Sequence, residues 1–174
     1  IFEMLNSDQF IDLLKEKKYD FEIFKHNALY TVEDSNKLRG VIKGSHSKNL
    51  FLKNKKNNFY LFSCEEYDQI NLKSISKSLN LGNLSFAREE HLNQYLGIKP
   101  GSVSPFSLLN DQKNNVVFYF EKTLYESELI NFHPLINTLT ITMNTMKFIE
   151  FMIENKKKIH IFSSVEGKIL KTYG

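Results

Sequence analysis

Cysteine is nearly absent from this chain. Cys64 stands alone, which excludes an intrachain disulfide and a zinc site built from cysteines. Tryptophan is missing, and with only 3 prolines and 7 glycines no Pro/Gly-rich linker divides the sequence. No apolar run approaches the roughly 20 residues of a membrane helix, and the N-terminal residues lack a signal-peptide pattern. These absences predict a soluble cytoplasmic protein in a reducing compartment.

The 174 residues fit one domain, which we expect to span residues 1–174. Hydrophobic residues make up 41% of the chain, with 15 Phe and 8 Tyr, so the core should be built from Phe, Leu and Ile. The net charge of +3 comes almost entirely from lysine, because only Arg39 and Arg88 are arginines. A net charge this small allows a polyanionic partner without requiring one. We expect neither a membrane nor DNA as partner.

Hydrophobic spacing and turn signals predict short helices and strands in mixed order. Ser7 or Asp8 should cap the first helix, and Asn144 the last. The polar residues 54–58 predict one hairpin, and Leu108-Leu109 is expected to form a second with the strand at 116–120. This order indicates an α+β fold. Helices are expected at 7–17, 31–39, 70–79, 89–96 and 144–153, and strands at 19–25, 50–52, 59–62, 84–86, 116–120, 137–143 and 159–162.

The segment 44–53 places Lys48 and Asn49 where a polar loop runs into the apolar strand Leu50-Phe51-Leu52. A cation and an amide at the start of a rigid strand could bind a phosphate or a developing oxyanion. The alternative is a surface lysine beside a turn asparagine, and spacing alone favours that alternative.

Two further segments combine backbone restriction with polar groups. In 101–106, Gly101 permits close backbone approach and Pro105 stiffens the loop exit. In 131–134, His133 precedes Pro134, which biases its backbone to an extended conformation and could hold the ring in one direction. A plain loop and a locally hydrogen-bonded histidine are the alternatives.

Several kinds of chemistry lack their motif. The histidines show no metal-binding spacing, and the sequence contains neither a Gly-x-Ser-x-Gly elbow nor a phosphate-binding Gly-x-x-x-x-Gly-Lys loop. Cys64 lies in an apolar strand, where an inert thiol is expected. We therefore expect no metal, no cofactor, no use of ATP and no covalent enzyme intermediate.

Taken together, Lys48-Asn49, Gly101-Ser102-Val103-Ser104-Pro105-Phe106 and Asn131-Phe132-His133-Pro134 resemble the YbaK/ProX family of prolyl-tRNA editing domains. The resemblance runs from about Phe21 to Phe151 and is strongest to the ProX-type alanyl-tRNA(Pro) deacylases. It implies a mixed, strongly curved or barrel-like sheet with short flanking helices, and metal-independent hydrolysis of the ester of mischarged tRNA(Pro).

The resemblance also implies roles for individual residues and partners. Mischarged tRNA(Pro) is the implied partner, and prolyl-tRNA synthetase is a further one. The implied catalytic residues are Lys48, Asn49 and His133, and the implied substrate-binding residues are Thr31, Gly101, Ser102, Val103, Ser104, Pro105 and Phe106.

Three alternatives stay open at this point. The removed amino acid could be cysteine or another residue instead of alanine. The chain could be an editing domain cut from a prolyl-tRNA synthetase, for which the hint is that it begins with Ile1 and not methionine. It could also be a tRNA-binding module without catalysis.

Overall fold

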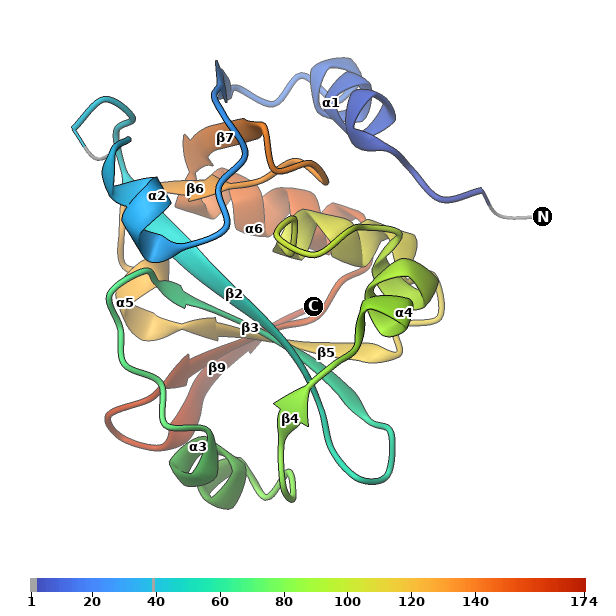
Figure 1. The fold of residues 1–174 in the computed structure, drawn as a ribbon, viewed down its shortest axis with the longest axis vertical. Helices are drawn as coiled ribbons and strands as arrows, with labels where there is room; N and C mark the ends of the chain where they lie inside the picture. Colours follow the sequence, from blue (N-terminus) through green and yellow to red (C-terminus); the bar gives the residue numbers. More distant parts are fainter. Residues whose placement is uncertain (1–2, 39) are drawn as a thin grey trace.

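The computed structural model describes residues 3–38 and 40–174. It consists of a mixed sheet surrounded by short helices (Figure 1). The strands are β1 (Glu22–Lys25), β2 (Ser45–Lys53), β3 (Phe59–Glu65), β4 (Ser85–Phe86), β5 (Val116–Glu121), β6 (Leu129–Phe132), β7 (Leu139–Asn144), β8 (Ile159–Ser163) and β9 (Lys168–Tyr173). The helices are α1 (Ser7–Glu16), α2 (Val32–Asn36), α3 (Leu72–Leu79), α4 (Glu89–His91), α5 (Lys122–Tyr125) and α6 (Thr145–Glu154), with a π-helical turn at Leu92–Leu96 and a 3-10 helix at Pro105–Asn110.

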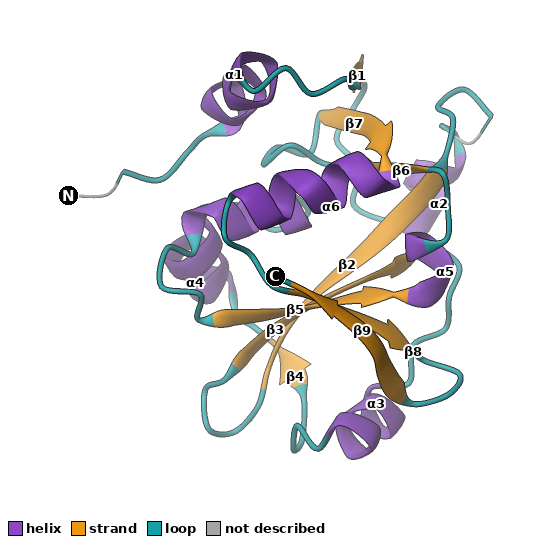
Figure 2. Ribbon diagram, turned by 180° about the vertical axis from the view of Figure 1, so that it is seen from behind, coloured by secondary structure: helices purple, strands orange, loops and turns teal. Residues whose placement is uncertain are grey.

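The sheet follows the order β1-β7-β6-β2-β3-β5-β8-β9, and the short β4 pairs with the end of β2. The pairs β2/β6, β3/β5 and β5/β8 are parallel, whereas the other neighbours are antiparallel. Strands β1 and β9 end this order, so the strongly twisted sheet is open and not a closed barrel (Figure 2). The predicted α+β class, with a large mixed sheet and short helices, is confirmed.

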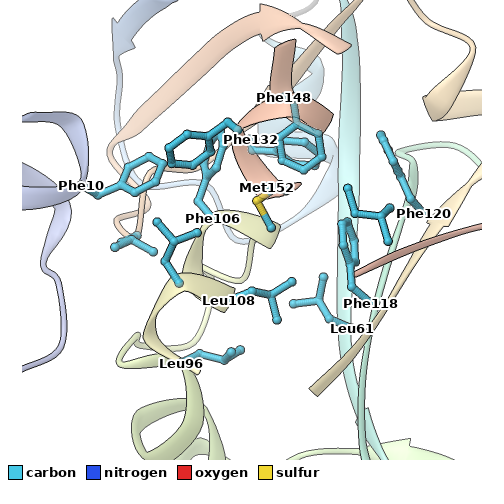
Figure 3. Close-up of a cluster of buried hydrophobic side chains, with 14 of the residues drawn as sticks. Phe10, Leu61, Leu96, Phe106, Leu108, Phe118, Phe120, Phe132, Phe148 and Met152 are labelled. Atoms are coloured by element: carbon cyan, nitrogen blue, oxygen red, sulfur yellow. The ribbon is translucent and has the colours of Figure 1, made fainter. Parts of the chain in front are cut away.

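The larger core lies between one face of the sheet and the helices α1, α6 and Pro105–Asn110. Phe106 is at its centre, with ring centroids 4.6 Å from Phe10, 5.6 Å from Phe132 and 5.7 Å from Phe148 (Figure 3). Leu61, Phe118 and Phe120 of β3 and β5 complete the contact from the sheet. This is the Phe- and Leu-rich core that the composition predicts.

The opposite face of the sheet carries a smaller core under α3. Ile75 of α3 packs with a row of sheet residues, namely Leu52, Tyr60, Phe62, Tyr119 and Phe162. Successive side chains of a strand point to opposite faces, so the even-numbered residues of β2 share the face of Leu52. The odd-numbered ones share the face of Phe51, which belongs to the larger core.

Helix caps follow the sequence closely. Asn144 caps α6 as predicted, and Thr31, the first residue of the helix expected over 31–39, caps α2. The cap of α1 is Asn6, one residue before the predicted Ser7 or Asp8. Asn6 and Gln9 form a reciprocal capping box, in which each side chain bonds the other's backbone N–H at 2.9 and 2.8 Å.

The predicted second hairpin is wrong. Leu108 and Leu109 lie in the 3-10 helix, and β5 is flanked on both sides by parallel strands, β3 and β8. The reason is burial: every residue of Pro105–Asn110 is buried, because this segment fills the space between α1, α6 and the sheet. Among the described residues, no helix combines the length and the apolar character needed to cross a membrane.

Candidate functional site

A cavity of about 330 Å³ is lined by residues of β2 and α2, two elements that are neighbours in Figure 1. It brings together segments that are far apart in the sequence: the turn before α2, the first half of β2, the Gly101 loop and the ends of β6 and β7. The described lining residues are Leu29, Tyr30, Thr31, Val32, Ser35, His46, Ser47, Lys48, Asn49, Glu66, Gly101, Val103, Asn131, Phe132, His133 and Thr140.

The cavity exists because one edge of β2 is only partly paired. On that edge β2 pairs with β6 at Ser45 and His46 and with β4 at Leu52 and Lys53. Between these points, the Phe51 carbonyl accepts a hydrogen bond from Ala87 N–H. Backbone groups alternate in direction along a strand, so those of Asn49 also point to this edge. The cavity wraps around the unpaired stretch of β2.

Lys48 and Asn49 reach the cavity from opposite faces of β2. Lys48 shares its face with His46, and its ammonium Nζ donates a hydrogen bond of 2.5 Å to the Asp68 carbonyl. An ammonium group has three donors, so two stay available for a ligand. The Asp68 carbonyl therefore fixes a cation at the cavity.

Asn49 belongs to a chain of hydrogen bonds on the other face. Its Oδ1 accepts from the Ser63 hydroxyl at 2.5 Å, and its Nδ2 donates to Ser47 Oγ at 3.1 Å. Ser47 Oγ in turn donates to the Asn131 carbonyl at 2.7 Å. These bonds fix the orientation of the Asn49 amide and use one of its two N–H groups. The second N–H is left for a ligand.

His133 follows β6 and lies on the face of the sheet that carries Lys48. Its Nδ1 is 2.8 Å from the Leu139 carbonyl, which can only accept, so Nδ1 carries the proton. Burial lowers the pKa of His133, and nearby His26 and His46 lower it further, against the opposing effect of the Leu139 carbonyl. The ring is therefore neutral at pH 7 and presents an unprotonated Nε2 as an acceptor.

This lowered pKa makes stability depend on pH. The folded protein binds the His133 proton less readily than the unfolded chain, so the stabilisation is full above pH 6.5, the ordinary value, and is lost as the pH falls towards the folded-state pKa. Between about pH 7 and pH 5, the unfolding free energy should fall more for the wild type than for His133→Asn, by up to about 1.4 kcal/mol per pH unit. Urea unfolding across this range measures both slopes. If the unfolding free energies of the wild type and of His133→Asn change equally with pH, the lowered pKa of His133 is contradicted.

The Gly101 loop is divided between the cavity and the core. Gly101 and Val103 line the cavity. The other members of the predicted binding loop do not line it, because the chain turns inward at this point. These buried residues are Ser102, Ser104, Pro105 and Phe106. A substrate-binding role for them stays a prediction without a contact to the cavity.

Gly101 is held in a conformation and a space that suit glycine. Its φ is +87°, and a Cβ there would lie 2.8 Å from Asn137 Nδ2 and 3.0 Å from the Tyr30 ring. The Asn137 amide is buried and its Oδ1 accepts a 2.9 Å bond from Leu29 N–H. A side chain at residue 101 would therefore push on the segment that forms the cavity wall.

Gly101→Ala should cost about 1–2 kcal/mol of stability and move this wall, and we expect a KM for the substrate roughly tenfold higher. Gly82→Ala is the matched control, because Gly82 has a φ of +78° and nothing within 4 Å of an added Cβ. It carries the same backbone strain far from the cavity. Steady-state kinetics and urea unfolding of both variants measure the difference, and equal KM values would contradict the role of the loop.

Thr31 lines the cavity, and its hydroxyl oxygen also caps a helix. Thr31 Oγ1 accepts a 3.0 Å bond from Asp34 N–H as the cap of α2. Tyr30 beside it is 71% exposed, with its ring against Gly101. Thr31 therefore supports the wall of the cavity, and any contact with substrate stays a prediction.

Sequence reasoning did not assign several polar lining residues, among them His46, Glu66, Asn131 and Thr140. Asn131 is buried, and its Nδ2 bonds the Lys43 and Ser45 carbonyls at 2.9 and 3.2 Å, which ties β6 to the start of β2. Glu66 is buried and accepts a 2.8 Å bond from Ser35. His46 and Asn131 stand in the quoted motifs, whereas Glu66 and Thr140 carry no local signal.

Cys64 lies opposite Lys48 in the β2/β3 register. Burial raises the pKa of its thiol to about 12, so the reactive thiolate is not populated at neutral pH. The thiol donates to the Lys48 carbonyl at 3.6 Å. This agrees with the expected inert, structural cysteine.

A second, larger cavity of about 680 Å³ lies where β5 and β8 begin and α6 ends. Its buried Lys157 bonds the Asp111 carbonyl and Asn114 Oδ1, each at 2.8 Å, so this ammonium has protein partners. None of the residues predicted to bind substrate lines it. Within residues 3–38 and 40–174, no group of three His, Cys, Asp or Glu side chains is placed to hold a metal ion.

Comparison with known proteins agrees with the motifs at the smaller cavity. Residues 26–151 match the aminoacyl-tRNA editing domain. The prolyl-tRNA editing protein ProX of Acetoanaerobium sticklandii is 33% identical over 132 residues, which cover 75% of this chain and 80% of the relative. Prolyl-tRNA synthetase associated domain-containing protein 1 of Mus musculus is 35% identical over 136 residues, again covering 75% and 80%.

A solved structure shares the fold. It is described as a candidate trans-editing enzyme for prolyl-tRNA synthetase, and it superposes with a TM-score of 0.62 at 14% identity, covering 90% of this chain and 96% of the other. The matched range contains Lys48, Asn49, Gly101 and His133, all of which line the smaller cavity. The chain belongs to the aminoacyl-tRNA editing domain family of YbaK/ProX type, as its motifs predicted.

Proposed function

We propose that this protein hydrolyses the aminoacyl ester of mischarged tRNA(Pro), with alanyl-tRNA(Pro) as the preferred substrate. The observation that carries the proposal is the convergence of Lys48, Asn49, Gly101 and His133 on one cavity. Membership in the editing family and the likeness to a prolyl-tRNA editing protein support the same reaction. The reaction belongs to translation, and its proposed place is the cytoplasm.

In the proposed mechanism, water attacks the ester carbonyl, the bond to the terminal ribose breaks, and the ribose oxygen takes a proton. Lys48 offers two free ammonium donors to a phosphate or to the developing oxyanion. Asn49 offers one oriented N–H to the terminal nucleotide. His133 Nε2 accepts a proton from, or orients, the ribose hydroxyl or the water. Neither a metal nor a covalent enzyme intermediate is part of this scheme.

The preference for alanine rests on size. A synthetase pocket that holds proline cannot strongly reject a smaller side chain, because each missing methylene is worth only about 1–3 kcal/mol. A second site that admits the small side chain and excludes the larger one corrects the error. Leu29, Val32 and Val103 line the cavity of about 330 Å³ and supply apolar walls for such a site.

The test is to incubate the protein with tRNA(Pro) charged separately with alanine, cysteine, serine and proline, and to follow the loss of each ester. We expect the alanyl ester to disappear fastest and the prolyl ester to persist. If the cysteinyl ester disappears faster than the alanyl ester, the preferred substrate is cysteinyl-tRNA(Pro), and the proposed deacylase reaction stands. Binding of tRNA(Pro) without hydrolysis of any ester would overturn the proposal in favour of a binding module.

A further inference from the structure

Three polar side chains form a row on the face of the sheet that carries Lys48. They are His133 after β6, Thr140 on β7 and His26 after β1. In the β6/β7 register Phe132 pairs with Ile141, so the next pair places His133 opposite Thr140. His26 Nε2 lies 2.7 Å from Thr140 Oγ1, and the two histidine rings are 6.0 Å apart. Thr140, between them, is buried and lines the cavity.

The hydrogen bonds of this row fix where its protons lie. His26 Nδ1 is 2.7 Å from the Asn27 carbonyl, which only accepts, so Nδ1 is the donor. In the neutral ring Nε2 is then an acceptor, and the Thr140 hydroxyl must donate to it. The single proton of Thr140 therefore points at His26, and the oxygen lone pairs are left for the cavity.

His133 follows the same logic. The Leu139 carbonyl takes its Nδ1 proton, so its Nε2 is also an acceptor. The β6/β7 side of the cavity thus presents two acceptors, while the β2 side presents the donors of Lys48 and Asn49. Glu66 adds a carboxylate to the lining. The Lys48 and Asn49 donors and the His133 and Thr140 acceptors thus come from different sides of the cavity, whereas Glu66 follows β3 and is joined to β2 by the bond from its N–H to the His46 carbonyl.

An aminoacyl ester has the complementary polarity. Its carbonyl oxygen accepts hydrogen bonds, and its α-ammonium group only donates them. We propose that Thr140 Oγ1 binds the α-ammonium group, which leaves the single lone pair of His133 Nε2 to the ribose hydroxyl or the water, and that His26 is a positioning residue which turns the Thr140 proton away from the ammonium. This inference rests on the proposed function, and it adds the recognition of a free amino group.

The experiment compares alanyl-tRNA(Pro) with N-acetyl-alanyl-tRNA(Pro), in which the ammonium is absent. The wild type should hydrolyse the free-amine ester at least tenfold more efficiently. Thr140→Val should remove most of that preference by slowing only the free-amine ester, and Thr140→Ser should keep it. His26→Met, which lacks an acceptor, should lower the preference, and His26→Gln, whose carbonyl accepts from Thr140, should restore part of it.

Thr142→Val is the matched control. Thr142 lies on the same strand and face, is equally buried, and donates its hydroxyl proton to Asn131 Oδ1. Loss of the Thr142 hydroxyl should slow the hydrolysis of both esters by the same factor. If Thr140→Val also slows both esters equally, or if the wild type shows no preference for the free amine, the inference is wrong while the deacylase function stands.

A binding measurement distinguishes failure of this inference from failure of the proposed deacylase function. The probe is adenosine carrying alanine in a stable 3′-amide, with and without N-acetylation, titrated by calorimetry. The free amine should bind the wild type at least tenfold more tightly, and Thr140→Val should bind both forms alike. If no ester is hydrolysed, the proposed function fails, and equal or absent binding of the two probes then overturns the inference as well.

Discussion

Lys48→Ala is expected to lower kcat/KM for hydrolysis of the aminoacyl ester by about 100- to 1,000-fold. Among the described lining residues, Lys48 is the only lysine. Its ammonium Nζ lies 2.5 Å from the Asp68 carbonyl oxygen, so the charge is in place before the substrate binds. Alanine leaves the developing negative charge without this partner. Steady-state deacylation with separate kcat and KM measures the effect.

The two constants distinguish two roles for Lys48. A fall in kcat at saturating substrate means that the ammonium acts in the transition state, whereas a rise in KM alone means that it only holds the substrate. Lys53→Ala is the matched control, because Lys53 is on the same strand but pairs with β4, outside the cavity. Both variants should unfold within about 1 kcal/mol of the wild type. A wild-type rate for Lys48→Ala would remove Lys48 from the proposed mechanism.

Local signals in the sequence predict the elements that depend on local contacts. The polar residues 54–58 give the β2/β3 hairpin, and Asn144 begins α6 by accepting from Lys147 N–H at 3.1 Å. Turns and caps of this kind involve neighbours within a few residues. They can therefore be predicted without knowledge of the fold.

Elements that form only by pairing with segments far away in the sequence cannot be predicted from local signals. Strand β9 was not predicted, because its residues are mostly exposed and it is a strand only through its pairing with β8. Strand β6 is only four residues long, and it pairs in parallel with β2 across more than 80 positions of sequence. That pairing brings His133 to Lys48, so only the family resemblance could link the two motifs beforehand.

The same limit applies to the candidate site. Thr140 joins the cavity because β7 pairs with β6, and nothing near Thr140 in the sequence signals it. The motif 101–106 predicts a single binding loop, yet the chain turns inward within it. Val103 faces the cavity, whereas Ser104 and Phe106 are fully buried. A contiguous motif need not have a single role where the backbone passes from surface to core.

Phe106→Ala should destabilise the fold by about 3–5 kcal/mol, a large share of the 5–15 kcal/mol typical of a domain. Phe106 is fully buried in the larger core, with its ring against Phe10, Phe132 and Phe148. Removing the ring loses these contacts and leaves a cavity that the surrounding elements cannot fill. For a chain of this length the melting temperature should fall by roughly 10 °C or more.

This variant also separates packing from substrate binding at Phe106. If the ring only packs, the folded fraction of Phe106→Ala, assayed well below its melting temperature, should keep a KM within about twofold of the wild type. Phe106→Leu fills most of the same space, so it should lose clearly less stability than the alanine variant. Urea unfolding and deacylation kinetics of both variants provide the measurement. A KM that rises in step with the size of the deletion, at unchanged stability, would instead place Phe106 in contact with substrate.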